Sequence, residues 1–203
     1  MPSLTNCSEA ESVAKSIVCH IGDPRTAKPA SLQEYGKLRE QMIQSPWACL
    51  SEQDFIRLVT EQGCPFYQAL MSGRDLQELQ FEKLVWRTQQ FAGLDFDVCE
   101  ISADNMRKHF QYLGLQPWLV YPTFSNGSVP NRQSYRLLWR TDCDLNLTYD
   151  ECSAALKKLR SLSNGMADKH ALNPTRMFQG SNAGFFHYDA KAVRLNLREL
   201  ARG

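Results

Sequence analysis

The stretch "FAGLDFDVCE", residues 91–100, places the strongest constraint on what this chain can fold into. It is an apolar run of the length of a buried strand, yet it carries Asp95 and Asp97 two residues apart. Because side chains alternate along a strand, both carboxylates are expected on one face. Two anions there repel each other and lose hydration, so the fold has to compensate them.

A hard divalent cation is one way to compensate two carboxylates, since Mg²⁺ is held by one or two carboxylates together with substrate phosphates. Phe96 would anchor the opposite face of the strand. The following "VCEIS" leaves the strand, so the two acids lie near a strand end, where binding sites are often built. The alternative is a strand end whose Asp residues cap turns, and the Asp-x-Asp pattern alone leaves both interpretations open.

The rest of the chain alternates between strand and helix patterns. Strands are predicted at 14–21, 63–70, 91–97, 116–124 and 134–140, with one or two short strands within 177–188. Capping patterns predict helix starts at Ser31 with Glu34, at Ser51, at Ser102 and at Thr148 with Glu151, and 191–200 is a final helix. Residues 71–90 fit a loop or a short helix. This order, without regular βαβ units, predicts an α+β fold in which helices cover a sheet.

Composition excludes several classes of protein. The 203 residues suffice for one large or two small domains, and 43% hydrophobic with 22% charged residues is typical of a globular chain. There is no apolar run long enough for a membrane span and no signal-peptide pattern at the N-terminus. The seven scattered cysteines contain no CxxC pair, which favours reduced thiols and a cytoplasmic location.

Downstream stretches add groups suited to phosphates. Arg136 lies on a predicted strand and would either bind a phosphate or form a structural ion pair with an Asp. The loop "MADKHALNPTR" combines Asp168 with Lys169 and Arg176, and Asp168 is either a third metal ligand or a solvated loop residue. The first half of the chain is acidic and the second half basic, which suits a surface facing phosphates or simply a solvated face.

Taken together, these stretches resemble one family: the catalytic domain of archaeo-eukaryotic-type primases, or primase-polymerases, as found in plasmid, phage and genomic-island replication proteins. "AGLDFD" resembles the first acidic motif, "TFSN" with "QSYRLLW" the second, and "MADKHALNPTRMFQG" the third. The chain departs from the family at Arg136, which stands where a His is usual. Arg136, Arg132 or Ser125 would then contact the nucleotide.

The resemblance implies a single catalytic domain over 1–203, with an N-terminal α/β part at about 1–90 packed on an RRM-like part at 91–203. It implies template-directed nucleotidyl transfer with two Mg²⁺ or Mn²⁺ ions. The substrates would be nucleoside triphosphates with a single-stranded DNA template and primer. A helicase domain or protein would be a further partner, and no membrane is involved. The implied residues are Asp95, Asp97 and Asp168 for catalysis and metal; Arg136, Ser125, Lys169 and Arg176 for the nucleotide; and Arg132, Arg140 and Lys157 for DNA.

Two other functions use the same residues. A nucleic-acid-binding or initiator module could keep the fold and lack catalysis. A metal-dependent nuclease would use the same acids but would need no site for a triphosphate.

Overall fold

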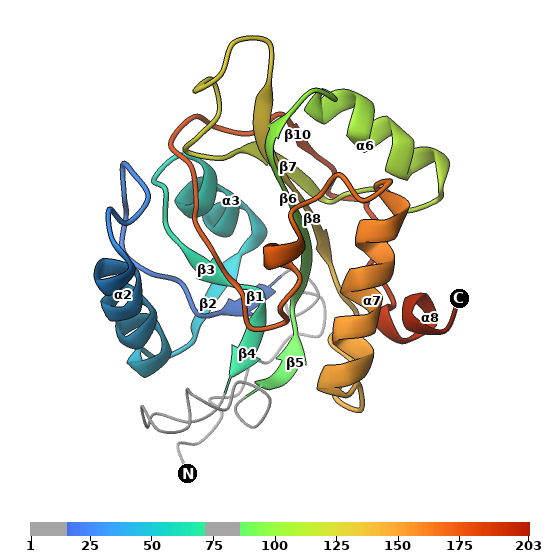
Figure 1. The fold of residues 1–203 in the computed structure, drawn as a ribbon. Helices are drawn as coiled ribbons and strands as arrows, with labels where there is room; N and C mark the ends of the chain where they lie inside the picture. The colour runs from blue at the N-terminus through green and yellow to red at the C-terminus, as the bar shows by residue number, and fades with distance from the viewer. Residues whose placement is uncertain (1–15, 72–85) are drawn as a thin grey trace.

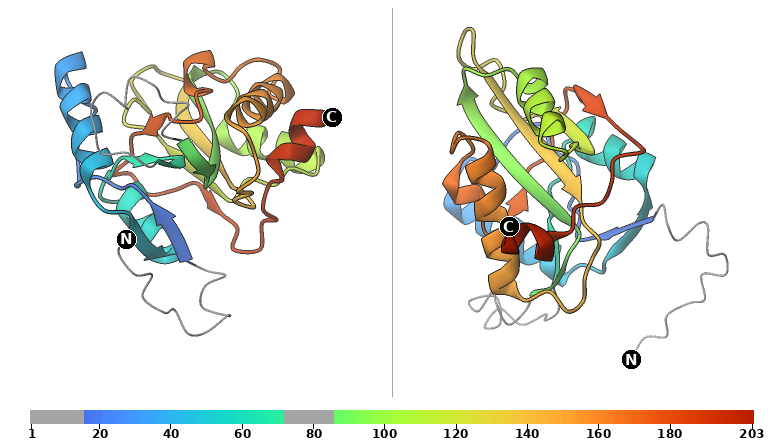
Figure 2. Two further views of the ribbon diagram at one scale, coloured as in Figure 1. Left: turned by 90° about the horizontal axis from the view of Figure 1, so that it is seen from below. Right: turned by 90° about the vertical axis from the view of Figure 1, so that its right-hand side faces the viewer.

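The structure, a computed structural model, describes residues 16–71 and 86–203. At its centre is a four-stranded sheet in the order β10-β7-β8-β6, in which every neighbouring pair is antiparallel (Figure 1). β6 and β8 are its longest strands and lie side by side (Figure 2). The strands are β6 (Phe91–Cys99), β7 (Leu119–Pro122), β8 (Gln133–Arg140) and β10 (His187–Tyr188).

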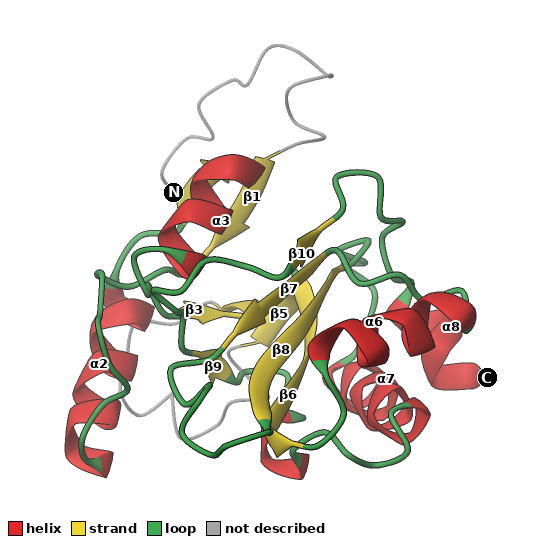
Figure 3. Cartoon of the chain, turned by 90° about the horizontal axis from the view of Figure 1, so that it is seen from above, coloured by secondary structure: helices red, strands yellow, loops and turns green. Residues whose placement is uncertain are grey.

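Three helices cover one face of this sheet: α6 (Ala103–Tyr112), α7 (Tyr149–Leu162) and α8 (Leu197–Arg202) (Figure 3). Leu94 and Phe96 of β6 point to this side and join the core formed with Phe110 and Leu156 of the helices. The alternation along β6 therefore sends its even-numbered residues to the helices and leaves Asp95 for the other face. This antiparallel sheet with helices on one face matches the predicted α+β class.

The N-terminal part covers the opposite face. Phe55 and Val59 of α3 pack there against Phe91, Leu138 and other buried residues of the sheet. A third core cluster lies under α2. The elements are β1 (Ser16–Cys19), α2 (Leu32–Gln44), β2 (Ala48–Ser51), α3 (Glu52–Thr60), β3 (Phe66–Tyr67), β4 (Ala69–Met71), β5 (Trp86–Gln89) and β9 (Met177–Phe178).

One short two-stranded sheet, β3 with β9, connects the two predicted sub-parts. β1 pairs with β2 and β4 with β5, whereas β3 pairs with β9 from far along the chain. The segment of β9 therefore crosses from the sheet to the N-terminal part. This crossing brings the residues after Asp168 over the face of the sheet that carries Asp95.

The four helix starts predicted from capping patterns are confirmed. Ser31, Ser51 and Ser102 each accept a hydrogen bond from a first-turn backbone N–H. Thr148 and Glu151 form the complete reciprocal capping box at the start of α7. Capping depends on residues three apart, so local sequence suffices to find it.

Three local predictions were wrong. Residues 48–51, where no strand was predicted, form β2, which pairs with β1. Residues 86–89, expected in a loop or short helix, form β5, and 72–85 lie outside the described residues. The last helix begins at Leu197 instead of 191, because Leu195 forms a bridge with Thr141 at the sheet. In all three cases the partner strand decided the outcome.

The cysteines in the described ranges are free thiols. Burial raises the pKa of Cys19 and of Cys152 to about 12, as expected for core residues. Over the same ranges no helix has both the length and the apolar character that crossing a membrane requires.

Candidate active site

Asp95 and Arg136 face each other across β6 and β8 and form a buried ion pair. Their Cα atoms are register partners, and Arg136 Nη2 donates to Asp95 Oδ2 over 2.8 Å. Arg136 is 3% exposed and Asp95 9% exposed. A buried pair of this kind satisfies two charges that would each be costly alone. Of the two interpretations of Arg136, this arrangement is that of the structural ion pair.

The remaining contacts of Arg136 are also with the protein. Its Nη1 donates to Tyr121 Oη over 2.8 Å and to the backbone oxygen of Gln179 over 2.6 Å. The guanidinium carbon lies 3.9 Å from the ring centre of Phe178, a cation–π distance. Burial lowers the pKa of Arg136, but Asp95 and Tyr121 more than offset this, so the net pKa is raised. Arg136 therefore stays charged and fixed beside Asp95.

Phe178 of β9 and the next residue, Gln179, close over this ion pair. A Cβ on Gly93 of β6 would lie 2.2 Å from Phe178 Cε2, so only glycine allows the ring to approach the strand. Asp95 Oδ1 and the side-chain amide atoms of Gln68 and Gln179 are buried with no hydrogen-bond partner in the described part of the chain. Such groups are rare in folded proteins and indicate a place where a ligand or water completes the contacts.

Asp97 lies at the exposed end of β6, where regular pairing stops. The register between β6 and β8 shifts between Phe96 and Cys99, as in a β-bulge. Val98 has a φ of 51°, an unfavourable conformation for a β-branched residue, and its N–H donates to Ser134 Oγ over 2.9 Å. The strained turn therefore sets the direction of Asp97, a pattern that recurs at functional sites.

A chain of polar contacts links Asp97 to the N-terminal part. Lys28 Nζ donates to Ser125 Oγ over 3.1 Å, and Ser125 Oγ donates to Asp97 Oδ1 over 3.4 Å. Ser125 follows β7, and Lys28 comes from the loop before α2. The sequence singled out Ser125 for the nucleotide, and the structure places it directly beside Asp97 with a lysine behind it.

Asp168 comes close to Asp95 through the backbone. The N–H of Asp168 donates to the carbonyl oxygen of Asp95 over 2.8 Å. Its side chain caps the short 3-10 helix η1 (Lys169–Ala171), with Oδ1 accepting from the N–H of His170 over 2.9 Å. A carboxylate far along the chain thus reaches the strand of the other two acids.

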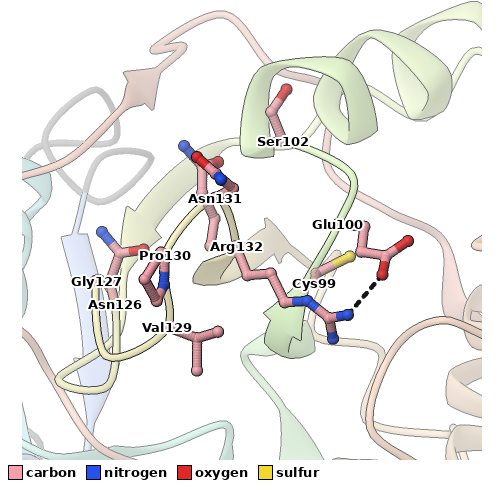
Figure 4. Close-up of a pocket in the computed structure, with 10 residues that line it drawn as sticks. Cys99, Glu100, Ser102, Asn126, Gly127, Val129, Pro130, Asn131 and Arg132 are labelled. Carbon is pink, nitrogen blue, oxygen red and sulfur yellow. Dashed lines mark hydrogen bonds and ion pairs between the residues drawn. The ribbon is translucent and has the colours of Figure 1, made fainter.

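Two hollows open around the end of β6. One of about 340 Å³ is lined by Asp97 and the residues after it together with Met166, which precedes Asp168 by two positions. A second, of about 430 Å³, lies between the start of α6 and the loop before β8 (Figure 4). Arg132, which forms an ion pair with Glu100, and Asn126 line this second hollow. Both volumes lie in the range of small-ligand sites.

The donor set fits a hard divalent cation, since carboxylate oxygens are the ligands that Mg²⁺ and Mn²⁺ prefer. Asp95 supplies a buried oxygen that has no hydrogen-bond partner within 16–71 and 86–203, and Asp97 and Asp168 are at least partly exposed. Over 16–71 and 86–203, no three His, Cys, Asp or Glu side chains are already gathered as a metal site. The side chains of Asp97 and Asp168 would therefore have to turn toward Asp95 to complete one.

The other predicted basic residues are spread over the molecule. Lys169 is exposed next to Asp168, and the Arg176 guanidinium lies 6.0 Å from the ring centre of Tyr35 on α2. Lys157 is exposed on α7, which covers the face of the sheet opposite to Asp95. Arg140 is buried at the far end of β8 in an ion pair with Glu52. Lys169 follows Asp168 directly in the chain, and Arg132 lies at the second hollow.

Sequence reasoning missed three residues at the site: Lys28, Ser134 and Gln179. Ser134 had a signal, since it alternates with Arg136 on the same strand face. Lys28 and Gln179 lie in loops, and their contacts with Ser125 and Arg136 join segments far apart in the chain. No local pattern marks such contacts.

Comparisons with known proteins give one structural relative to report. The chain is similar in structure to the AEP domain of the primase-polymerase (PrimPol) of cyanophage S-2L, with 14% sequence identity, a TM-score of 0.45, and coverage of 94% of this chain and 89% of that chain. No family model and no curated protein matches the sequence.

Proposed function

We propose that the chain catalyses template-directed nucleotidyl transfer, as a primase or DNA polymerase in the replication of a mobile genetic element. The observation that carries the proposal is the hydrogen bond from the Asp168 N–H to the Asp95 carbonyl. It joins the acidic strand to a third carboxylate in a loop rich in cations. Three acids in that order along the chain are also what the motif resemblance implies.

In this proposal Asp95, Asp97 and Asp168 hold two Mg²⁺ or Mn²⁺ ions, which would activate the attacking 3′-hydroxyl and stabilise the leaving pyrophosphate. Asp95 is the fixed member of the set, because Arg136 holds its Oδ2 and leaves Oδ1 available. Arg136 then acts on the nucleotide through Asp95, by keeping that carboxylate ionised and in place. This role differs from the direct triphosphate contact that the sequence suggested for it.

The cations around the acids serve the triphosphate and the template. Lys28 and Lys169 would neutralise charge on an incoming nucleotide, and Ser125 would offer it a hydrogen bond. Arg176 lies further along the chain from Lys169. Positioning and electrostatic stabilisation of this kind account for most of the catalysis in phosphoryl transfer. Arg132 at the second hollow is placed to contact the DNA backbone, a contact without sequence preference.

The test is extension of a primed single-stranded template with each nucleoside triphosphate pool and either metal. Asp97→Asn should remove extension while the protein still folds, because Asp97 is exposed. Asp104→Asn is the matched control, since Asp104 is an exposed acid on α6 outside the site. Full extension by Asp97→Asn, or equal losses in both variants, would contradict the proposal. Cleavage of DNA without added nucleotide would indicate the nuclease instead.

A nucleic-acid-binding or initiator module without catalysis is the second candidate. The ion pair between Asp95 and Arg136 favours it, because Arg136 occupies the place of the usual His and already neutralises one acid. Tight binding of single-stranded DNA together with no extension under either metal would decide for this candidate.

A further inference from the structure

A cavity of about 650 Å³ lies away from the acids, at the opposite end of β8. Its walls come from the start of α3, from Trp118 before β7, from Arg140 and from the segment 188–194. Arg140 is four residues along β8 from Arg136, about 13 Å at the rise of a strand. Leu138, which is buried and is the register partner of Gly93 on β6, lies between the two places. This cavity is therefore distinct from the candidate active site.

The walls are rich in positive charge. Arg140, Lys191 and Arg194 line the cavity, and Glu52 is the acidic residue among the lining side chains. The Glu52 carboxylate already accepts hydrogen bonds from Arg140 and from the hydroxyl of Tyr188. Burial lowers the pKa of Arg140, and the charge of Arg194 lowers it further. Cations crowded in this way are stabilised by an added anion.

Two sets of N–H donors also favour an anion in this cavity. Ser51, Glu52 and Gln53 line the cavity at the N-terminus of α3, where backbone N–H groups and the helix dipole favour anions. Trp118 is 2% exposed, and its indole N–H is buried without a hydrogen-bond partner among the residues that the structure describes. A buried donor without an acceptor is costly. A bound acceptor group next to Trp118 would remove that cost.

We propose that this cavity is a second binding site, for the phosphate group of a nucleotide, either free or within a nucleic-acid strand. The cations and N–H donors supply the phosphate contacts, and Tyr188 and Trp118 supply aromatic walls of the kind that take up a nucleobase. The volume suits a ligand of nucleotide size. The inference goes beyond the proposed catalysis and does not depend on it.

The test measures binding in EDTA, so that metal-dependent binding at the carboxylates does not contribute. The probes are deoxyadenosine monophosphate, deoxyadenosine and a short single-stranded oligonucleotide, titrated by calorimetry. In parallel, NMR follows the indole N–H signals of the four tryptophans. The signal that disappears in Trp118→Phe is assigned to Trp118. We expect that signal to shift with the phosphate-bearing probes and not with deoxyadenosine.

Charge reversal at exposed positions supplies the matched variants. Lys191→Glu at the cavity should weaken binding about tenfold to a hundredfold, as for loss of a charge-assisted contact. Lys37→Glu on α2 makes the same charge change outside the cavity and should have less than about a threefold effect. Binding of the monophosphate would identify a free nucleotide as the ligand, and binding of the oligonucleotide alone would identify a strand. An unmoved Trp118 signal, or equal weakening by both variants, would overturn the proposal.

Discussion

Replacing Arg136 by Ala is the most informative single perturbation of the sheet. It would deprive Oδ2 of the buried Asp95 carboxylate of its partner, while Oδ1 already has no hydrogen-bond partner among the described residues. Breaking a buried ion pair from one side costs about 3–5 kcal/mol. For a chain of this length each kcal/mol lowers the thermal midpoint by about 2–4 °C, so the expected fall is roughly 6–20 °C.

The assay combines thermal and urea unfolding with nucleotide binding on the same variants. Asp95→Leu together with Arg136→Met removes both charges at similar volume. That double variant should lie within about 2 kcal/mol of the wild type or above it, because no charge is left unpaired. The difference between the double variant and the sum of the two single variants measures the coupling of the pair.

Two outcomes would refute this reasoning. One is an Arg136→Ala midpoint within about 2 °C of the wild type. The other is a loss of nucleotide affinity of about tenfold or more with stability retained. That is the result expected if Arg136 contacts a triphosphate directly, because losing a charge-assisted contact costs about 1.5–3 kcal/mol. In that case Arg136→Lys should restore only part of the affinity, since an ammonium cannot replace the bidentate guanidinium.

Three further predictions concern the rest of the molecule. Asp97→Asn should lower nucleotidyl transfer, measured by primer extension, by about a hundredfold or more. Its thermal midpoint, measured by calorimetry, should stay within about 1 °C of the wild type, and a clear fall in the midpoint would show that Asp97 is structural. Gly93→Ala should cost about 1–3 kcal/mol in urea unfolding, since its Cβ would clash with Phe178, and an unchanged midpoint would show that the ring moves freely. Burial lowers the pKa of His20, whose Nε2 accepts a hydrogen bond from Trp47. The unfolded chain therefore binds a proton more readily than the folded chain, so stability that is present above about pH 6.5 should fall as the pH drops below that value. His20→Gln should make the thermal midpoint depend less on pH between about pH 7 and about pH 5.

The sequence predicted those parts of the fold that depend on neighbours in the chain. Ser102 caps α6 and Thr148 with Glu151 caps α7, because each contact spans three residues. The apolar run around Asp95 became the longest strand, and its alternation placed Asp95 on one face and Leu94 on the other. The α+β class followed from the same patterns.

Contacts between distant segments decided what the sequence did not predict. β2 and β5 are short, and each exists because a partner strand pairs with it. Likewise, the pattern around Arg136 left an anionic ligand and an Asp as alternatives, and only the register of β6 against β8 brings Asp95 opposite to it. Lys28 carried no signal at all, since its contact with Ser125 crosses from the N-terminal part to the sheet.

The two carboxylates of the acidic strand are thus compensated in different ways. Asp95 is buried and fixed by Arg136, whereas Asp97 is exposed and accepts a long hydrogen bond from Ser125. A fixed acid beside a movable one suits a site that has to close around a ligand, because the buried member preserves the geometry and the exposed member can turn. The strained Val98 after Asp97 is where such a turn would be absorbed, since a residue at positive φ gains by leaving that conformation. Repulsion between the two carboxylates is thereby confined to the end of the strand, where water can reach Asp97.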